Sequence, residues 1–378
     1  MPTSESVKDS LCVIPWIHSS TDSFGNIRIC CMANLSPYGY LRRKDQTRHN
    51  AKTDSIPRNH EYYKDVRSQM IKGIRLDMCK QCWMLEESGL HSNRLVYNEC
   101  MYPDEIERIV TLTGEDGEIN PQDFPIRYYD LRFGTKCNSK CIICNNCNSS
   151  MWDDRVDDWT HGKLEAPYIK DLLKDVEYID RLYITGGEPT VIQNHWDLLD
   201  ILIKEGHAKN IAVDYNSNGV VLTKKMLETW SHFKSVGIGF SIDGMGKTYE
   251  QIRYPSKWKT IIRNLDLFDT YAAENTNGSF AMTILSLNVL NVIDFFKWYY
   301  AKKFEKIRIV PHFNILSRPL EMDIRRLDTE QKLIIEKQYD LFYEWIDQNC
   351  HEEEEIINEI KRGYSGIINA MRMEPFEI

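Results

Sequence analysis

Hydrophobic residues between positions 126 and 316 follow two alternating patterns, one typical of strands and one typical of helices. Short β-type runs predict strands at 126–133, 181–185, 210–216, 236–243, 279–285 and 306–316. Segments with apolar residues three or four positions apart predict helices at 195–206, 223–233, 259–274 and 291–303. Six strands in alternation with helices indicate βαβ units and a parallel sheet. We therefore expect an α/β fold of the partial (β/α)6 barrel type, with functional loops at the carboxyl ends of the strands.

The flanking segments lack this alternation and predict three further parts of the chain. Residues 1–102 are expected to form a separate module anchored by cysteines, and residues 103–125, which are rich in proline and glycine, a linker. The barrel core then covers 126–320, and 321–378 form a helical extension. This extension begins with a capping-box pattern, Asp328 and Gln331. Further along, Ile334, Leu341 and Trp345 share one helical face.

Composition and charge narrow the class of protein. The chain has 378 residues, 42% of them hydrophobic, which is enough to fill a substantial core. Its net charge of −9 argues against a nucleic-acid backbone as the main partner. The first ten residues are polar, and no apolar run approaches the roughly 20 residues that span a membrane. We therefore expect a soluble, cytoplasmic protein that binds neither membranes nor nucleic acid.

Eleven cysteines are many for such a protein, and ten of them fall in two groups. Clustered thiols in a reducing compartment are typical of metal ligands and not of disulfides. Six lie in the first hundred residues: Cys12, Cys30, Cys31, Cys79, Cys82 and Cys100. Four more lie in the stretch GTKCNSKCIICNNCNSS: Cys137, Cys141, Cys144 and Cys147. The sequence thus predicts two metal centres.

The second group has the spacing C-x3-C-x2-C, formed by Cys137, Cys141 and Cys144. Structural zinc sites usually pair two C-x2-C hooks to reach four ligands. Three thiolates suit three corners of an iron–sulfur cube, which leaves the fourth iron open and reactive. Cys147 is the spare cysteine of this loop.

This hook follows the first predicted strand, and GGEP follows the second, an order that resembles the radical S-adenosylmethionine (SAM) superfamily. The resemblance implies a [4Fe–4S] cluster on the three cysteines, with SAM chelating the open iron. It also implies SAM contacts at the residues that match further family features. These are Gly186, Gly187, Glu188 and Pro189 of GGEP, Asn216, and Ser241, Asp243 and Arg253 near the SAM ribose and carboxylate. Where the family usually has an aromatic residue beside the adenine, this chain has Ile143.

The N-terminal cysteines resemble a second family pattern, the auxiliary-cluster modules called SPASM and, in shortened form, twitch. The resemblance implies a second [4Fe–4S] cluster held by Cys12, Cys30, Cys79 and Cys82. Cys31 competes with Cys30, which we prefer because it keeps the Gly-x4-Cys spacing from Gly25. A zinc ion could use the same four ligands. The module normally follows the barrel, whereas here it precedes it.

Together these resemblances imply reductive cleavage of SAM to a 5′-deoxyadenosyl radical, which abstracts hydrogen from a substrate. An electron donor such as flavodoxin or ferredoxin would reduce the first cluster. The auxiliary cluster would accept an electron during oxidation or cross-linking of a peptide or protein side chain. The alternative within the family is a dehydrogenase or epimerase of a small sugar-like metabolite. The alternative from another class is a zinc-binding scaffold or nucleic-acid module.

Overall fold

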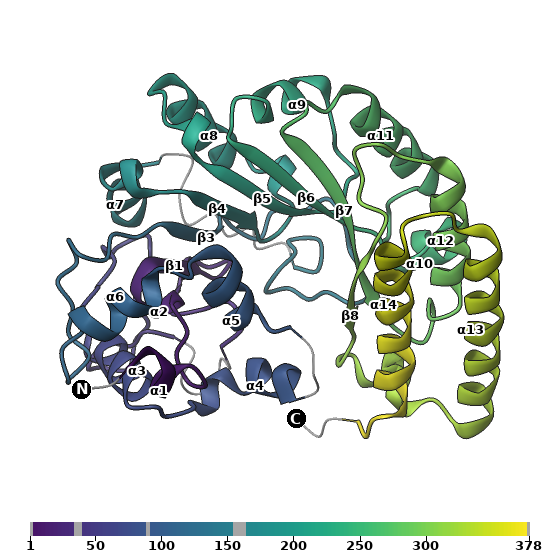
Figure 1. Ribbon diagram of the computed structural model, residues 1–378. Helices are drawn as coiled ribbons and strands as arrows, with labels where there is room; N and C mark the ends of the chain where they lie inside the picture. The colour runs from purple at the N-terminus through teal and green to yellow at the C-terminus, as the bar shows by residue number, and fades with distance from the viewer. Residues whose placement is uncertain (1–2, 34–39, 88–90, 154–163, 376–378) are drawn as a thin grey trace. The chain divides into compact units, whose positions relative to one another are not determined.

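The computed structural model describes residues 3–33, 40–87, 91–153 and 164–375. Within these residues, eight strands form a mostly parallel sheet accompanied by helices (Figure 1), which confirms the predicted α/β class. The chain divides into two compact units. Unit 1 comprises residues 1–136, 156–187 and 192–212, and unit 2 comprises 137–155, 188–191 and 213–378. Among the described residues, no helix has the length and apolar character needed to cross a membrane.

Unit 1 contains four strands in the spatial order β2–β1–β3–β4. The strands are β1 (His18–Thr21), β2 (Ile27–Arg28), β3 (Tyr128–Arg132) and β4 (Arg181–Thr185). The α-helices are α1 (Ser4–Val7), α2 (Ile14–Ile17), α3 (Glu61–Ile71), α4 (Lys80–Glu87), α5 (Asn93–Leu95), α6 (Glu105–Leu112), α7 (Pro167–Lys174) and α8 (Gln193–Lys204). Short helical turns are η1 (Asp77–Cys79), η2 (Val96–Met101), η3 (Val176–Tyr178) and η5 (Ala208–Asn210).

The N-terminal segment contributes directly to the sheet of unit 1. Strand β1 runs parallel to β3, with Ser20 opposite Asp130, and antiparallel to β2. The segment 103–125 contains α6, in which Ile109 is fully buried and Glu105 forms an ion pair with Arg127. The proposed boundaries between the N-terminal module, the linker and the core stay a prediction.

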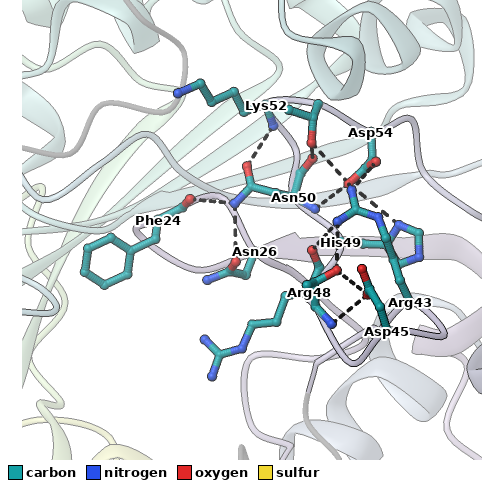
Figure 2. A network of polar contacts seen from close by, with 11 residues as sticks. Phe24, Asn26, Arg43, Asp45, Arg48, His49, Asn50, Lys52 and Asp54 are labelled. Carbon is teal, nitrogen blue, oxygen red and sulfur yellow. Dashed lines mark hydrogen bonds and ion pairs between the residues drawn. The ribbon is translucent and has the colours of Figure 1, made fainter.

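A loop after β2 is held by a network of charged and polar side chains (Figure 2). Both Nη2 hydrogen bonds of Arg43 go to the carboxylate of Asp54, at 2.7 and 2.6 Å. The backbone N–H of Asn50 donates to the same carboxylate at 2.7 Å. The side chain of Asn50 donates to the carbonyl of Phe24 at 2.9 Å. Asp54 therefore joins Arg43 to Asn50 within the loop, and Asn50 joins the loop to Phe24.

Unit 2 contains the strands β5–β6–β7–β8, in that spatial order. They are β5 (Ala212–Ser217), β6 (Ser235–Ser241), β7 (Thr276–Ile284) and β8 (His312–Ile315). The helices are α9 (Lys224–Trp230), α10 (Gly246–Ile252), α11 (Trp258–Tyr271), α12 (Asn291–Lys302), α13 (Thr329–Asn349) and α14 (Glu354–Arg372). Short turns are η4 (Pro189–Val191), η6 (Leu320–Met322) and η7 (Ile324–Arg326). The C-terminal helices α13 and α14 lie side by side (Figure 1).

The two faces of strands β6 and β7 differ in character. Phe240 on β6 contacts Phe268 of α11, and Phe280 on β7 contacts Phe295 of α12, with ring centroids 5.1 and 5.0 Å apart. These aromatic side chains pack between the strands and helices α11 and α12. The opposite face of β6 carries Gly237, Gly239 and Ser241, because successive residues of a strand point to opposite sides. The carboxyl ends of these strands lead into the loops that we expect to carry functional residues.

Candidate active site

The cysteine loop 137–147 lies against the segment that follows α10. The backbone N–H of Lys140 donates to the carbonyl of Tyr254 at 2.6 Å, and that of Ile142 to the carbonyl of Ile252 at 2.9 Å. These two hydrogen bonds bracket Cys141, which is buried. The indole N–H of Trp152 donates to the Cys141 carbonyl at 3.1 Å. The loop is therefore fixed by backbone contacts on both sides of its central cysteine.

The three predicted ligands converge in this loop. The Cys141 thiol raises the pKa of Cys137, and the thiols of Cys137 and Cys141 both raise the pKa of Cys144. Burial is the largest cause in every case, and it raises the pKa of Cys144 to about 11. Cys147 is exposed, as the spare cysteine of the loop. Cys141 is buried, and Cys137 and Cys144 are partly buried. Three thiols are the number of protein ligands that an iron–sulfur cluster with one open iron takes.

Residue Glu188 of the GGEP segment is 1% exposed and ties two strand-end segments together. Its Oε1 accepts hydrogen bonds from the backbone and hydroxyl of Thr190 at 3.1 and 2.7 Å and from the Ser217 hydroxyl at 2.8 Å. Its Oε2 accepts from the backbone N–H of Asn218 at 2.7 Å. Burial raises the pKa of the Glu188 carboxyl, although these donors act in the opposite direction. The Glu188 side chain is thus occupied within the protein, and its neighbour Pro189 is buried in η4.

The same network continues into the cysteine loop. The side-chain amide of Asn218 donates to Oδ1 of Asn138 at 2.6 Å and to the Ser139 hydroxyl at 3.2 Å. The Ser139 hydroxyl lies 3.1 Å from the Ser256 hydroxyl. The backbone carbonyl of Ser139 accepts a hydrogen bond from the Ser149 hydroxyl at 2.8 Å. Hydrogen bonds therefore connect Glu188 to the turn after β5, and connect that turn to the residues beside Cys137.

The glycines before Glu188 form a cradle that side chains would fill. Gly186 and Gly187 have positive φ values of 81° and 39°. A Cβ on Gly187 would lie 2.2 Å from the carbonyl oxygen of Lys136, and one on Gly186 would lie 2.8 Å from Cβ of Arg132. Only glycine allows this close approach to the segment 132–136. The two glycines are therefore required by the packing of GGEP against the residues that precede the cysteine loop.

The residues expected near the SAM ribose and carboxylate are also in unit 2. Asp243 is fully buried, and its Oδ2 lies 2.7 Å from both Nε and Nη2 of Arg253. Ser241 is half-buried at the end of β6, and Asn216 is exposed on β5 beside Gly239. Ile143 is partly buried against the apolar cluster of Ile252, Leu285 and Leu316. The structure brings Asp243 and Arg253 together, whereas it places Asn216 and Ser241 on separate strands.

In unit 1 the four predicted auxiliary ligands line one cavity. Cys79 ends the turn that leads into α4, which carries Cys82, so both thiols face the same space as Cys12 and Cys30. Burial raises the pKa of Cys79 to about 12 and also raises that of Cys12 and Cys82. Within the described residues, no group of three or more His, Cys, Asp or Glu side chains is arranged to hold a metal ion.

Several residues around these sites carried no signal in the sequence. Arg94 lines the cysteine cavity, and its guanidinium lies 2.6 Å from Oε2 of Glu86 and lowers the pKa of Cys12. Tyr97 lines it as well, with its ring 5.8 Å from that of Tyr128 on β3. Neither belongs to a recognisable motif, so only the tertiary structure identifies them. The same holds for Asn138, Ser139 and Ser256 beside the cysteine loop.

Part of the chain is similar to known proteins. Residues 131–298 match the family model of the radical SAM superfamily. Mycofactocin maturase MftC of Mycobacterium tuberculosis is 24% identical over 162 residues, which is 42% of this chain and 38% of MftC. The MftC of Mycolicibacterium smegmatis matches over the same length with the same identity. The match thus spans well under half of these relatives.

Solved structures that resemble the chain include native anSMEcpe with bound AdoMet, with a TM-score of 0.43 and 16% identity over 60% of this chain and 63% of anSMEcpe. Streptococcus suis SuiB has a TM-score of 0.42 and 14% identity over 87% of this chain and 70% of SuiB. The family model begins at the end of β3 and covers the cysteine loop, GGEP and the strands through β7. Residues 131–298 of this chain are therefore similar to the radical SAM superfamily.

Proposed function

We propose that this protein is a radical SAM enzyme that oxidises or cross-links a peptide or protein side chain. One observation carries the proposal: a single set of contacts ties the three-thiol loop to GGEP and to the end of β6. Asn218 joins the loop to Glu188, and Arg253 joins Cys141 to Asp243. Within unit 2, these contacts link Glu188, Asn218, Asp243 and Arg253 to the cysteine loop.

Cys137, Cys141 and Cys144 would hold the [4Fe–4S] cluster in this site. When bound, the cluster and SAM supply a 5′-deoxyadenosyl radical that abstracts a hydrogen atom from the substrate. The thiols must lose their protons to become ligands, and because burial raises their pKa values, they release these protons on binding the cluster. Gly186 and Gly187 would meet the SAM amino group through their backbone. Ile143 would supply an apolar contact for the adenine.

Cys12, Cys30, Cys79 and Cys82 would hold a second [4Fe–4S] cluster in the cavity of unit 1. Four thiolates would leave no iron open, which suits a cluster that accepts one electron from the substrate radical. The guanidinium of Arg94 offsets part of the negative charge of the thiolates, since it lines the same cavity. The net reaction we propose is therefore an oxidation.

The similarity to mycofactocin maturases supports our proposal that the substrate is a peptide or protein. The test uses anaerobically reconstituted protein, dithionite, SAM and candidate peptides with deuterated side chains, among them those encoded beside the gene. Transfer of deuterium from a peptide into 5′-deoxyadenosine supports the proposal. Transfer from a deuterated sugar-like metabolite, with none from any peptide, would replace it with the small-molecule alternative.

A further inference from the structure

Arg253 lies next to the central cysteine of the cluster loop. It directly follows α10 and is 8% exposed. The backbone hydrogen bonds from Lys140 to Tyr254 and from Ile142 to Ile252 place residues 253 and 141 side by side. Nη1 of Arg253 lies 3.9 Å from Sγ of Cys141, within hydrogen-bond distance for sulfur.

The orientation of this guanidinium is fixed from the opposite side. Its Nε and Nη2 both lie 2.7 Å from Oδ2 of Asp243. The other carboxylate oxygen, Oδ1, accepts a hydrogen bond from the backbone N–H of Thr283 on β7 at 2.7 Å. Because Asp243 is fully buried and anchored to the sheet, it holds the edge formed by Nε and Nη2 and leaves Nη1 directed at the thiol.

We propose that Arg253 is a positioning residue that donates a hydrogen bond to the Cys141 thiolate of the bound cluster and raises its reduction potential. The inference rests on the proposed function. Reduction adds a negative charge to the cluster, and a cation that donates to a ligand sulfur stabilises the reduced form. The effect is strong because the pair is buried and water screens it little. This role is separate from the SAM carboxylate contact that the family resemblance implies for Arg253, because it depends on Nη1 and the Cys141 sulfur.

A purely structural ion pair would predict no effect on the cluster, and the chain provides a matched control. Arg325 and Asp323 form a second buried pair in unit 2, with side chains 4% and 1% exposed. Nε of Arg325 lies 2.8 Å from Oδ1 and Nη2 lies 2.7 Å from Oδ2 of Asp323. Arg325→Gln therefore removes a buried ion pair of similar geometry in the same unit.

The test is a redox titration of the reconstituted full-length protein, followed by electron paramagnetic resonance of the signal that changes when SAM is added. At the potential where the wild-type cluster is half reduced, we expect Arg253→Gln to lower the ratio of reduced to oxidised cluster about tenfold, which is ~59 mV for one electron. Arg253→Lys should lower this ratio by less than Arg253→Gln does. Arg325→Gln should have the reduction potential of the wild type. An unchanged potential in Arg253→Gln, with weaker SAM binding, would overturn the inference.

A second measurement does not depend on the variants retaining their cluster. Wild-type protein labelled with nitrogen-15 arginine should show an arginine nitrogen coupled to the reduced, SAM-responsive cluster. Absence of this coupling overturns the role of Arg253, while the proposed function stands as long as 5′-deoxyadenosine is released. A protein that forms no cluster and releases no 5′-deoxyadenosine would instead contradict the proposed function itself.

Discussion

The side-chain amide of Asn218 donates a hydrogen bond to Oδ1 of Asn138 at 2.6 Å, so the turn after β5 holds the residue next to Cys137. Asn218 is buried, and its own Oδ1 accepts from the backbone N–H of Val220 at 3.0 Å. A side chain in this position both shapes its turn and positions the cluster loop.

Asn218→Ala should therefore destabilise the protein and loosen the cysteine loop. It leaves Asn138 and the Val220 N–H without these partners, and we expect the free energy of unfolding to fall by about 1–3 kcal/mol. Chemical denaturation measures this loss, and the rate of iron release to a chelator measures the loosening. Asn146→Ala, at an exposed position of the same loop, is the control. Equal stability and iron release in both variants would contradict the positioning role.

The auxiliary site predicts a specific iron content. Wild-type protein should contain about eight irons, from two four-iron clusters, and Cys79→Ala should contain about four, because one ligand of the closed cluster is lost. Cys100→Ala changes an exposed cysteine of the same unit and should keep all eight. Iron and sulfide assays on anaerobic protein decide this. Full iron in Cys79→Ala, or zinc in the wild type, would rule out the assignment.

Because the carboxyl of Asp130 is buried, we expect the free energy of unfolding to fall as the pH rises. It is fully buried on β3, where Oδ2 accepts from Ser20 at 3.2 Å and Oδ1 lies 3.9 Å from Nε of Arg132. Burial raises the pKa of this carboxyl above its ordinary 3.8. Its stabilising contribution is thus complete below pH 3.8 and is lost as the pH rises through the raised value.

Asp130→Asn should consequently gain stability relative to the wild type as the pH rises from 3.8 towards that raised value, by about 1.4 kcal/mol per pH unit. Urea denaturation of the apoprotein at a series of pH values measures the difference. A difference that stays constant over the series would show that the carboxyl has an ordinary pKa in the folded protein.

For Asp54 we expect the opposite pH dependence, with a contribution to folding stability that is lost as the pH falls. Burial acts to raise the pKa of this carboxyl, but hydrogen bonds from the Asn50 backbone and from Arg43 outweigh it, and the pKa is lowered below 3.8 (Figure 2). The stabilisation is present above pH 3.8 and is lost as the pH falls through the lowered value. Asp54→Asn should cost about 1 kcal/mol at neutral pH, because the pair is partly exposed. The same denaturation series should show this cost disappear in acid, and a cost independent of pH would contradict it.

Much of the fold is predictable because local signals agree with tertiary packing. The alternating pattern locates the strands of unit 2, Gly206 follows α8 with φ 81°, and Asp328 and Gln331 form the predicted capping box. The last predicted strand is shorter, because Pro311 has no N–H for the ladder and β8 begins at His312.

Other features have no local signal. Strand β1 reads HSST, four buried polar or small residues without alternation, so its pairing with β3 depends on tertiary contacts. On α13 the buried residues are Ile335, Tyr339, Phe342 and Ile346. The face with Ile334 and Leu341 is instead about half exposed, since a helix with apolar residues on several sides does not define its own buried face.

The candidate site divides in the same way. The spacing of Cys137, Cys141 and Cys144 is a sequence motif, and the structure keeps these thiols close together. By contrast, the contact of Arg253 with Cys141 spans 112 positions along the chain, and only the folded loop produces it. Motifs therefore identify the ligands, while the contacts that orient them come from the fold.

The most direct test of the central claim measures 5′-deoxyadenosine after reconstituted protein is incubated with SAM and dithionite. Wild-type protein and Cys147→Ala, which changes the exposed cysteine of the loop, should both release 5′-deoxyadenosine. Cys141→Ala should release none, because it removes the buried central ligand. Release by Cys141→Ala at the wild-type rate, or no release by wild-type protein that contains its iron, would contradict the account.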